Sequence, residues 1–445
     1  MRGLAIRARR TARSGRTLLK ALGPGLVTGA ADDDPSGITT YTQAGAQLGT
    51  GSLWMAVLTL PLMVGIQLVS ARIGWASGRG IAANAREHLP RGVLWLLVGS
   101  LAAANTINLG ADLSAMGSVA ELAFGGSGRL WLLGFALFSL ALQVFLPFPR
   151  YAPILKLLTL SLLAYVGVTL TLKVPWLEVL RASVMPALDS PFDAQSNGSW
   201  MLLVAVLGTT ISPYLFFWQA SHEAEERSAS DARRRARGLG PRATQQEARW
   251  ARRHLRRIRL DTVLGMLLSN AIAWFVMLAA ALTLHVHGIS DVQSTAQAAE
   301  ALRPLAGDLA FQLFAAGIIG TGLLAVPVLA GSAAYALAEG LGWPASLQIK
   351  PGAARGFYGA LSAAVLIGAG MDSLHLDPVK ELLWSAVING FAAVPIMVVV
   401  IWLAQKRAVM GERVISPRLR VLAWSATVAM AAASAAFLLD SFLGR

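Results

Sequence analysis

The sequence predicts an all-α membrane protein of about eleven transmembrane helices. Of its 445 residues, 55% are hydrophobic and only 14% are charged, whereas a soluble domain of this length needs far more charge to cover its surface. Apolar segments of about twenty residues, long enough to cross a hydrocarbon core about 30 Å thick, recur along the whole chain. Lysine and arginine collect in every second connection between these segments, which is typical of a multi-pass membrane protein.

The apolar segments form two halves of five spans each, followed by one more span. A basic tail over 1–21 precedes spans 1–5, which occupy 22–174, and an outer loop over 175–198 separates the halves. Spans 6–10 occupy 199–404, with a basic loop over 222–259 after the first of them, and span 11 covers 419–440. The individual spans are expected near 22–48, 53–77, 93–121, 129–148, 154–174, 199–221, 260–284, 308–339, 356–371, 381–404 and 419–440.

The basic residues predict the orientation in the membrane. If the tail is cytoplasmic, every inner connection is basic and the outer ones hold almost no lysine or arginine. The positive-inside rule then places the N-terminus in the cytoplasm and the C-terminus outside. A bacterial inner membrane is the simplest setting, and we expect a monomer. A mitochondrial transit peptide is the alternative interpretation of the arginine-rich, acid-free start.

Several function classes are excluded or disfavoured by composition. The formal charge of +14 comes largely from the run over 232–260, whose position between spans 6 and 7 is explained by topology and contact with anionic lipid, so no nucleic-acid partner is expected. The absence of cysteine excludes disulfides and thiolate metal sites. There is no nucleotide-binding loop and no Ser/His/Asp arrangement, so we expect neither an enzyme nor a cofactor.

Span 1 contains the strongest functional signal, three consecutive aspartates followed by proline. Carboxylates near the centre of a bilayer are costly and are usually functional. Pro35 has no N–H and Gly37 weakens a helix, so the chain should unwind here and expose main-chain carbonyls beside Asp34. Such a site offers only oxygen ligands and suits a hard cation. The alternative is that Asp32–Asp34 form a solvated extracellular turn and that span 1 is shorter.

Span 6 is interrupted at the corresponding place by Gly208 and Ser212-Pro213. Because each half has an odd number of spans, the halves have opposite orientation. Paired breaks in two inverted five-helix repeats are the design of secondary transporters, in which the substrate binds at mid-membrane between the breaks. A proline kink without a ligand role is the other interpretation.

These motifs resemble the Nramp family of divalent metal transporters. The resemblance covers most of the chain in span order, and it is carried by Gly23-Pro24-Gly25, Asp34-Pro35, Gln43-Ala44-Gly45 and Pro213. It implies a LeuT-like fold of two inverted five-helix repeats plus one extra helix, with helices 1 and 6 unwound. It also implies a metal site made by an Asp-Pro-Gly-Asn motif in helix 1 and an Ala-x-x-Met-Pro-His motif in helix 6.

Carried over to this chain, the resemblance assigns Asp34 as the anchoring charge. Main-chain oxygens around Asp33, Thr209 and Thr210 would help it. The other residues implied at the metal are Gly37 and Ser212, which stand where the family has Asn and Met, and Asn389 in helix 10. A low-priority set for the ion pathway consists of Asp32, Asn108, Asp112, Tyr214 and Gln219; Tyr214 and Gln219 stand where the family has histidines.

The departures from the family motifs change the expected ion. Ser212 removes a thioether, which favours softer metals, and Gly37 widens the cavity, which suits the partly hydrated Mg²⁺. The loss of both histidines and of the helix-3 glutamate, here Ala115, removes proton acceptors. The chain therefore resembles the NRAMP-related magnesium transporters, which implies transport of Mg²⁺, and of Mn²⁺ as well, without tight proton coupling.

The remaining polar residues leave several alternatives open. Asn105 and Asn108 are interpreted mainly as packing residues, and Asp112 as part of a hydrated path. His222, Glu223, Glu225 and Glu226 at the cytoplasmic end of span 6 are interpreted as a solvated helix end, with guidance of ion release as the alternative. The rival functions are a proton-coupled Mn²⁺/Fe²⁺ importer, a transporter of amino acids on the same scaffold, which Asp34 disfavours, and an intramembrane aspartyl enzyme, for which only Asp112 could pair with Asp34.

Overall fold

A computed structural model describes the chain over 24–146, 150–151, 163–171, 173–185, 199–238, 244–294, 298, 308–374 and 377–443. The predicted basic tail 1–21 lies outside these residues. All regular structure within the described ranges is helical. In the first half the α-helices are α2 (Pro24–Asp32), α3 (Pro35–Leu48), α4 (Leu53–Ser77), α5 (Ile81–His88), α6 (Arg91–Phe124), α7 (Gly128–Phe145), α9 (Leu163–Thr171) and α10 (Trp176–Val184).

The second half is built in the same way and ends with one additional helix. Its α-helices are α11 (Ser199–Thr210), α12 (Pro213–Ala236), α13 (Thr244–Thr283), α15 (Asp308–Leu341), α16 (Arg355–Met371), α17 (Pro378–Gln405), α18 (Arg407–Met410) and α19 (Pro417–Leu443). Short 3-10 turns lie at Gly49–Ser52, His285–His287, Pro351–Ala353 and Asp372–Leu374.

Each predicted span corresponds to helix in the described residues. Eight helical stretches are long and apolar enough to cross a membrane, and one of them, Pro35–Ser77, contains two predicted spans. The other two predicted spans correspond to α16, of 17 residues, and to α9, of which nine residues are described. Both predicted breaks are present, between α2 and α3 and between α11 and α12.

Two of the predicted connections between spans contain helix. The basic segment 222–259 is mostly helix, because α12 continues to Ala236 and α13 begins at Thr244. Alanine, arginine and glutamate dominate this segment and are strong helix formers, so charge alone does not end the helices. The predicted outer loop 175–198 contains α10, which is amphipathic rather than a transmembrane span.

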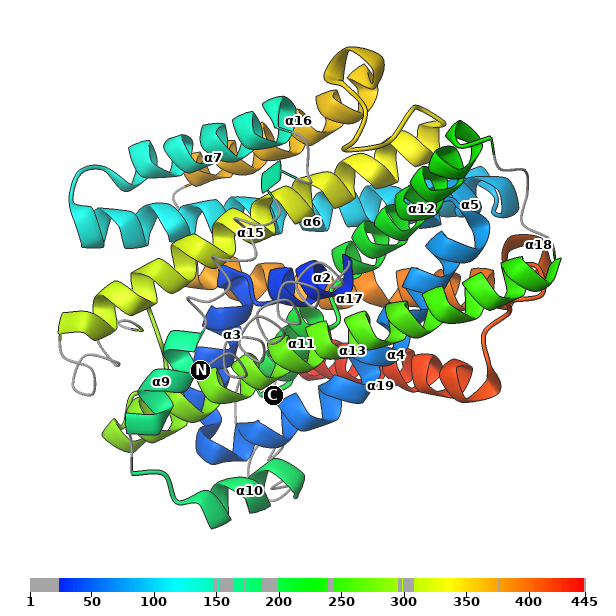
Figure 1. Ribbon diagram of the computed structural model, residues 1–445. Coiled ribbons are helices and arrows are strands. Elements are labelled where there is room, and N and C mark those ends of the chain that lie inside the picture. The colour runs from blue at the N-terminus through cyan, green and yellow to red at the C-terminus, as the bar shows by residue number, and fades with distance from the viewer. Residues whose placement is uncertain are drawn as a thin grey trace, which may run out of the picture.

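The helices form two groups with the broken helices between them. Figure 1 shows α6, α7, α15 and α16 packed together on one side of the molecule, and α4, α13 and α19 on the other. The segments α2, α3, α11 and α17 run through the middle; α2, α3 and α17 contact both groups, and α11 packs against α17, α19, α3 and α4. Both breaks are therefore held in the interior of the bundle, away from lipid.

Glycines let α2 approach α13 at backbone distance. A Cβ added to Gly29 would lie 2.3 Å from the carbonyl carbon and oxygen of Gly265, so only glycine fits there. One turn earlier, Gly25 N donates a 2.7 Å hydrogen bond to Asp261 Oδ2. Close helix packing through small residues is the usual way to join helices in a bilayer, where no hydrophobic effect drives them together. These contacts fix the short helix α2 against α13.

Candidate functional site

The break in helix 1 is built by Asp34 as the N-cap of α3. Asp34 is extended (φ −71°, ψ 171°), and its Oδ1 accepts a 2.7 Å hydrogen bond from Gly37 N. Pro35 occupies the first helical position, where its missing N–H costs nothing and its fixed φ suits a helix. The positive end of the α3 dipole therefore points at the carboxylate and stabilises its charge.

The break in helix 6 repeats this construction with a serine. Ser212 is the extended N-cap of α12, and Pro213 takes the first helical position. The Ser212 hydroxyl does not cap α12, however. It donates back to the carbonyl oxygens of Gly208 (2.9 Å) and Thr209 (2.6 Å) at the end of α11. The two breaks therefore share their backbone design but differ in that only helix 1 places a carboxylate at the cap.

The two breaks meet beside Gly37. A Cβ added at Gly37 would lie 3.1 Å from Thr209 Oγ1, 3.2 Å from the Asp32 carbonyl oxygen and 3.4 Å from Asp34 Oδ1. Three oxygens from both broken helices thus surround one point on the α3 backbone. This convergence brings together four of the residues that the sequence predicts for the metal or its path.

The second carboxylate oxygen of Asp34 is contacted by side chains of α6 and α12. Asn108 Nδ2 donates to Asp34 Oδ2 at 3.0 Å. Tyr214 donates to the Ala31 carbonyl at 2.8 Å, and its hydroxyl also lies 3.3 Å from Asp34 Oδ2. All of the Asp34 partners are nitrogen or oxygen groups, and the Asp34 residue is 2% exposed.

Asn108 connects Asp34 to the remaining polar groups of α6 and α17. Its Nδ2 also lies 3.2 Å from Asp112 Oδ2, and its Oδ1 accepts hydrogen bonds of 3.1 Å each from Ser385 Oγ and Asn389 Nδ2. Asp112 Oδ1 in turn accepts from Ser36 N at 3.2 Å. Asn108 is therefore at the centre of the cluster, which corrects its interpretation as mainly a packing residue.

Asp32 and Asp33 lie next to Asp34 and share one partner on α13. Ser269 Oγ is 2.7 Å from Asp32 Oδ2 and 3.2 Å from Asp33 Oδ1. Both aspartates are fully buried, so the alternative of a solvated turn is wrong. Asp32 Oδ1 and Asp33 Oδ2 are buried without a hydrogen-bond donor among the described residues, and so is Asn389 Oδ1.

The charge of this cluster is not balanced by a cationic side chain within the described part of the chain. None of the ion pairs between described residues involves Asp32, Asp33, Asp34 or Asp112. Unpaired buried carboxylates are costly, so this group must take up protons or bind a cation. Oxygen-rich, negatively charged and lined by main-chain carbonyls, the site can bind a hard divalent ion.

The side chains of three predicted site residues are hydrogen-bonded to groups other than Asp34. The Thr210 hydroxyl donates to the Val206 carbonyl, and the Ser212 hydroxyl is held by α11 as described above. Gln219 belongs to another network, in which Gln67 Nε2 donates to its Oε1 at 2.6 Å and its own Nε2 donates to Thr262 Oγ1 at 2.8 Å. Their predicted roles at the ion or on its pathway remain predictions.

Sequence reasoning missed Ser36, Ser269 and Ser385. In an apolar helix, a serine that hydrogen-bonds to a site residue looks the same in sequence as a serine that hydrogen-bonds to a carbonyl of its own helix. A possible signal was present for Ser36, which occupies a motif position of the family, and for Ser385, which lies one turn from Asn389 in a span with few polar residues. Nothing in the sequence indicated Ser269.

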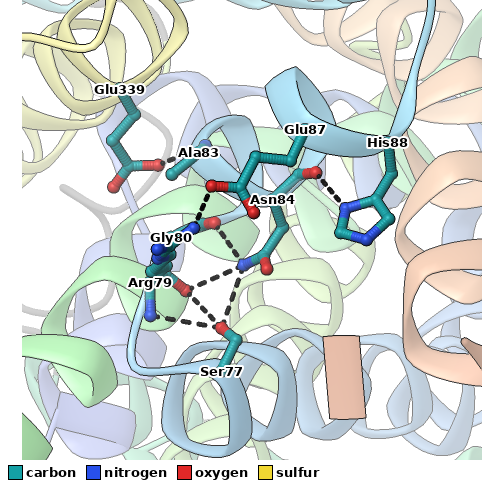
Figure 2. A network of polar contacts seen from close by, with 8 residues as sticks. All are labelled: Ser77, Arg79, Gly80, Ala83, Asn84, Glu87, His88 and Glu339. Carbon is teal, nitrogen blue, oxygen red and sulfur yellow. Dashed lines mark hydrogen bonds and ion pairs between the residues drawn. The ribbon is translucent and has the colours of Figure 1, made fainter. Parts of the chain in front are cut away.

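A cavity of about 610 Å³ lies at the far end of α12, between α4, α5 and α15. Glu225 and Glu339 line it. Figure 2 shows how its α5 wall is fixed: Asn84 Nδ2 donates to Ser77 Oγ (2.9 Å) and Gly80 O (2.8 Å), and Glu339 Oε2 accepts from Ala83 N (3.2 Å). The predicted topology makes this end cytoplasmic.

Replacing Asn108 by alanine is expected to weaken ion binding by about 10- to 100-fold, because it removes the group that orients the Asp34 carboxylate. Asn105→Ala is the matched control, since Asn105 lies one turn away and its one hydrogen bond to a described residue goes to the Leu329 carbonyl (3.2 Å). Ion affinity of both purified variants, measured by titration calorimetry, checks the expectation. Equal losses in the two variants would contradict a role specific to Asn108.

Comparisons with known proteins agree with the geometry. A family model described as natural resistance-associated macrophage protein-like (Nramp) matches residues 25–440. The divalent metal cation transporter MntH of Deinococcus radiodurans is 27% identical and covers 99% of this chain and 94% of its own length. MntH of Klebsiella pneumoniae is 25% identical, over 96% of this chain and 95% of its own.

Solved structures share the fold. The crystal structure of the Eremococcus coleocola manganese transporter with an aromatic bis-isothiourea compound superposes with a TM-score of 0.70 at 16% identity, covering 94% of this chain and 86% of that one. Mhp1, a nucleobase-cation-symport-1 family transporter in a closed conformation, gives a TM-score of 0.51 at 12% identity, over 95% and 93% of the two chains. The chain thus has the LeuT-like transporter fold.

Proposed function

The chain belongs to the Nramp family, and on that premise we propose that it carries Mg²⁺, and Mn²⁺ as well, across a membrane by alternating access without tight proton coupling. The family's shared activity is the transport of divalent metal cations, and the two MntH relatives are divalent metal cation transporters. The observation that carries the proposal is Asp34, a buried carboxylate at the break of helix 1, opposite the break of helix 6.

The preference for magnesium is supported by the chemistry around Asp34. Its hydrogen-bonding partners are Gly37 N, Asn108 and Tyr214, none of which contains sulfur. Ser212 stands where the family has a methionine, so no thioether is supplied at this position. Oxygen ligands, without the Asn and Met side chains that the family has at positions 37 and 212, favour an ion that keeps part of its water shell, as Mg²⁺ does. Mn²⁺ accepts the same ligands, and the structural relative is a manganese transporter.

One observation favours a second candidate, a proton-coupled Mn²⁺/Fe²⁺ importer. Asn108 touches both Asp34 and Asp112, so a short polar chain joins the candidate ion ligand to a second buried carboxylate on α6. Such a chain could pass a proton when the ion arrives. Against it, the glutamate that the family carries three residues after Asp112 is here Ala115, and Tyr214 and Gln219 stand at its two histidine positions.

Alternating access would move the broken helices α2/α3 and α11/α12 against α6, α7, α15 and α16, which pack together as one group. We expect the N-terminus in the cytoplasm and a bacterial inner membrane as the location. The chain would act as a monomer with no resident cofactor, and the transported ion is its substrate.

Ion uptake into proteoliposomes tests the proposal. Purified protein is reconstituted with a Mg²⁺ indicator or a Mn²⁺ indicator and a pH dye inside the vesicles. We expect Mg²⁺ and Mn²⁺ to enter at rates well above those of protein-free vesicles, with no acidification linked to the metal flux. Uptake of Mn²⁺ alone, accompanied by acidification of the lumen, would support the proton-coupled importer and contradict the magnesium proposal.

A further inference from the structure

A second group of possible metal ligands lies between α12 and α13, away from Asp34. It consists of Glu223, Glu226 and His254, and one donor atom from each lies within 4.8 Å of the others. Glu223 and Glu226 are three residues apart on α12, so their side chains share a face of that helix. Glu223 is ten residues beyond Pro213, which corresponds to about 15 Å along the helix axis.

Two donor atoms of this group face each other at ion-pair distance. His254 Nε2 and Glu223 Oε2 are 3.5 Å apart, which is an ion pair only when the imidazole is protonated, and their side chains are 11% and 2% exposed. Both atoms are buried and have no hydrogen-bond partner in the described part of the chain. The separation exceeds an ordinary N–H···O distance, but it matches the spacing of about 3.4 Å between neighbouring ligand atoms around a tetrahedral ion with bonds of about 2.1 Å.

The surroundings hold the histidine and one glutamate in place. The His254 ring is stacked on Trp75, with ring centroids 5.4 Å apart and planes inclined by 17°, and Trp250 lies 5.6 Å away. Glu226 Oε1 accepts a 2.8 Å hydrogen bond from Arg257 Nη1. The imidazole is therefore oriented by aromatic packing, while Arg257 competes with any cation for one Glu226 oxygen.

This burial overturns the interpretation of the span-6 end as a solvated helix terminus. Glu223 is 1% exposed and His222 is 7% exposed. A buried carboxylate with an oxygen that lacks a donor is costly unless a cation reaches it. At an acidic helix end exposed to solvent, water would donate a hydrogen bond to each carboxylate oxygen.

We propose that Glu223, Glu226 and His254 form a second divalent-cation site, selective for ions of the Mn²⁺ and Zn²⁺ class over Mg²⁺. One imidazole nitrogen and two carboxylates are ligands that such borderline ions accept readily, whereas Mg²⁺ prefers oxygen alone. A bound cation would join α12, which begins at the helix-6 break, to α13. The site is independent of the transported ion at Asp34 and stands whether or not Asp34 binds metal.

Mn²⁺ binding to the purified full-length protein in nanodiscs tests the proposal, with Asp34→Ala as the background that removes the other candidate site. Free Mn²⁺ is followed by its paramagnetic resonance signal. We expect one Mn²⁺ bound per Asp34→Ala protein, and an affinity at least about tenfold lower after Glu223→Gln or His254→Ala. A tenfold molar excess of Mg²⁺ should not displace the Mn²⁺.

Glu225→Gln is the matched control, because its carboxylate instead accepts from Tyr335 (2.7 Å) and Gln348 (3.0 Å). It should leave Mn²⁺ binding unchanged. A second readout needs no variant of the cluster that might unfold: spin-echo modulation from a nitrogen ligand should appear on Mn²⁺ bound to Asp34→Ala protein. Absence of bound Mn²⁺, or bound Mn²⁺ without a nitrogen signal, would overturn the proposal, and neither result would bear on transport through Asp34.

Discussion

Asp34→Asn is expected to lower divalent ion uptake by about 100-fold or more while leaving the protein folded. Asparagine is as good an N-cap as aspartate, so α3 should still begin at residue 35 and Gly37 N should keep its acceptor. The variant removes only the negative charge. Loss of one member of a buried charge pair costs about 3 kcal/mol or more, which corresponds to about two orders of magnitude in binding.

The chain contains a matched control for this experiment. Asp377 precedes Pro378 and caps α17, with its carboxylate accepting a 2.9 Å hydrogen bond from Val379 N. It lies twelve residues before Asn389, which corresponds to about 18 Å along the helix axis. Asp377→Asn should transport like the wild type. Uptake is measured in proteoliposomes at matched protein density. An Asp34→Asn variant with wild-type uptake would show that Asp34 is not the anchoring charge.

The second large effect is expected from restoring the two family residues that this chain lacks. The double variant Gly37→Asn, Ser212→Met should raise the preference for Mn²⁺ over Mg²⁺ by about tenfold or more, because the thioether favours the softer ion and the two larger side chains narrow the site. Methionine at 212 would also release the Gly208 and Thr209 carbonyls that the serine hydroxyl now occupies. Only a small shift is needed at Gly37, where a Cβ would lie 3.1 Å from Thr209 Oγ1.

Competition between Mg²⁺ and Mn²⁺ for uptake measures this preference directly. The single variants are the controls, and each should produce part of the change. Thermal unfolding in detergent separates a change in selectivity from a loss of folded protein. If the double variant keeps the wild-type ratio of the two ions, these positions do not determine the selectivity.

The breaks could be predicted from the sequence because local chemistry determines them. Asp34-Pro35 and Ser212-Pro213 each combine a good N-cap with proline at the first helical position, and each stands inside a long apolar segment. The inverted relation of the two halves followed from counting spans. These features depend on residues close together in the chain, which is where sequence reasoning is strongest.

The partners of the aspartates could not be predicted, because they come from distant helices. Ser269 is 237 residues from Asp32, and the sequence around it is an ordinary apolar span. The burial of Glu223 was missed for a related reason: a charged helix end looks the same in sequence whether it faces water or packs against another helix. Trp75 and Trp250, which help to cover His254, lie on α4 and α13, and no periodic pattern joins them.

The absence of protein counter-charges around the four buried aspartates also concerns the electrical behaviour of the carrier. None of the ion pairs between described residues includes them, so the charge within the site changes by two when a divalent ion enters and no proton leaves. Each elementary charge moved through a potential of 100 mV corresponds to about 2.3 kcal/mol. The loaded and empty forms therefore respond differently to voltage. A negative interior would favour inward movement of the loaded site and oppose inward movement of a negatively charged empty one.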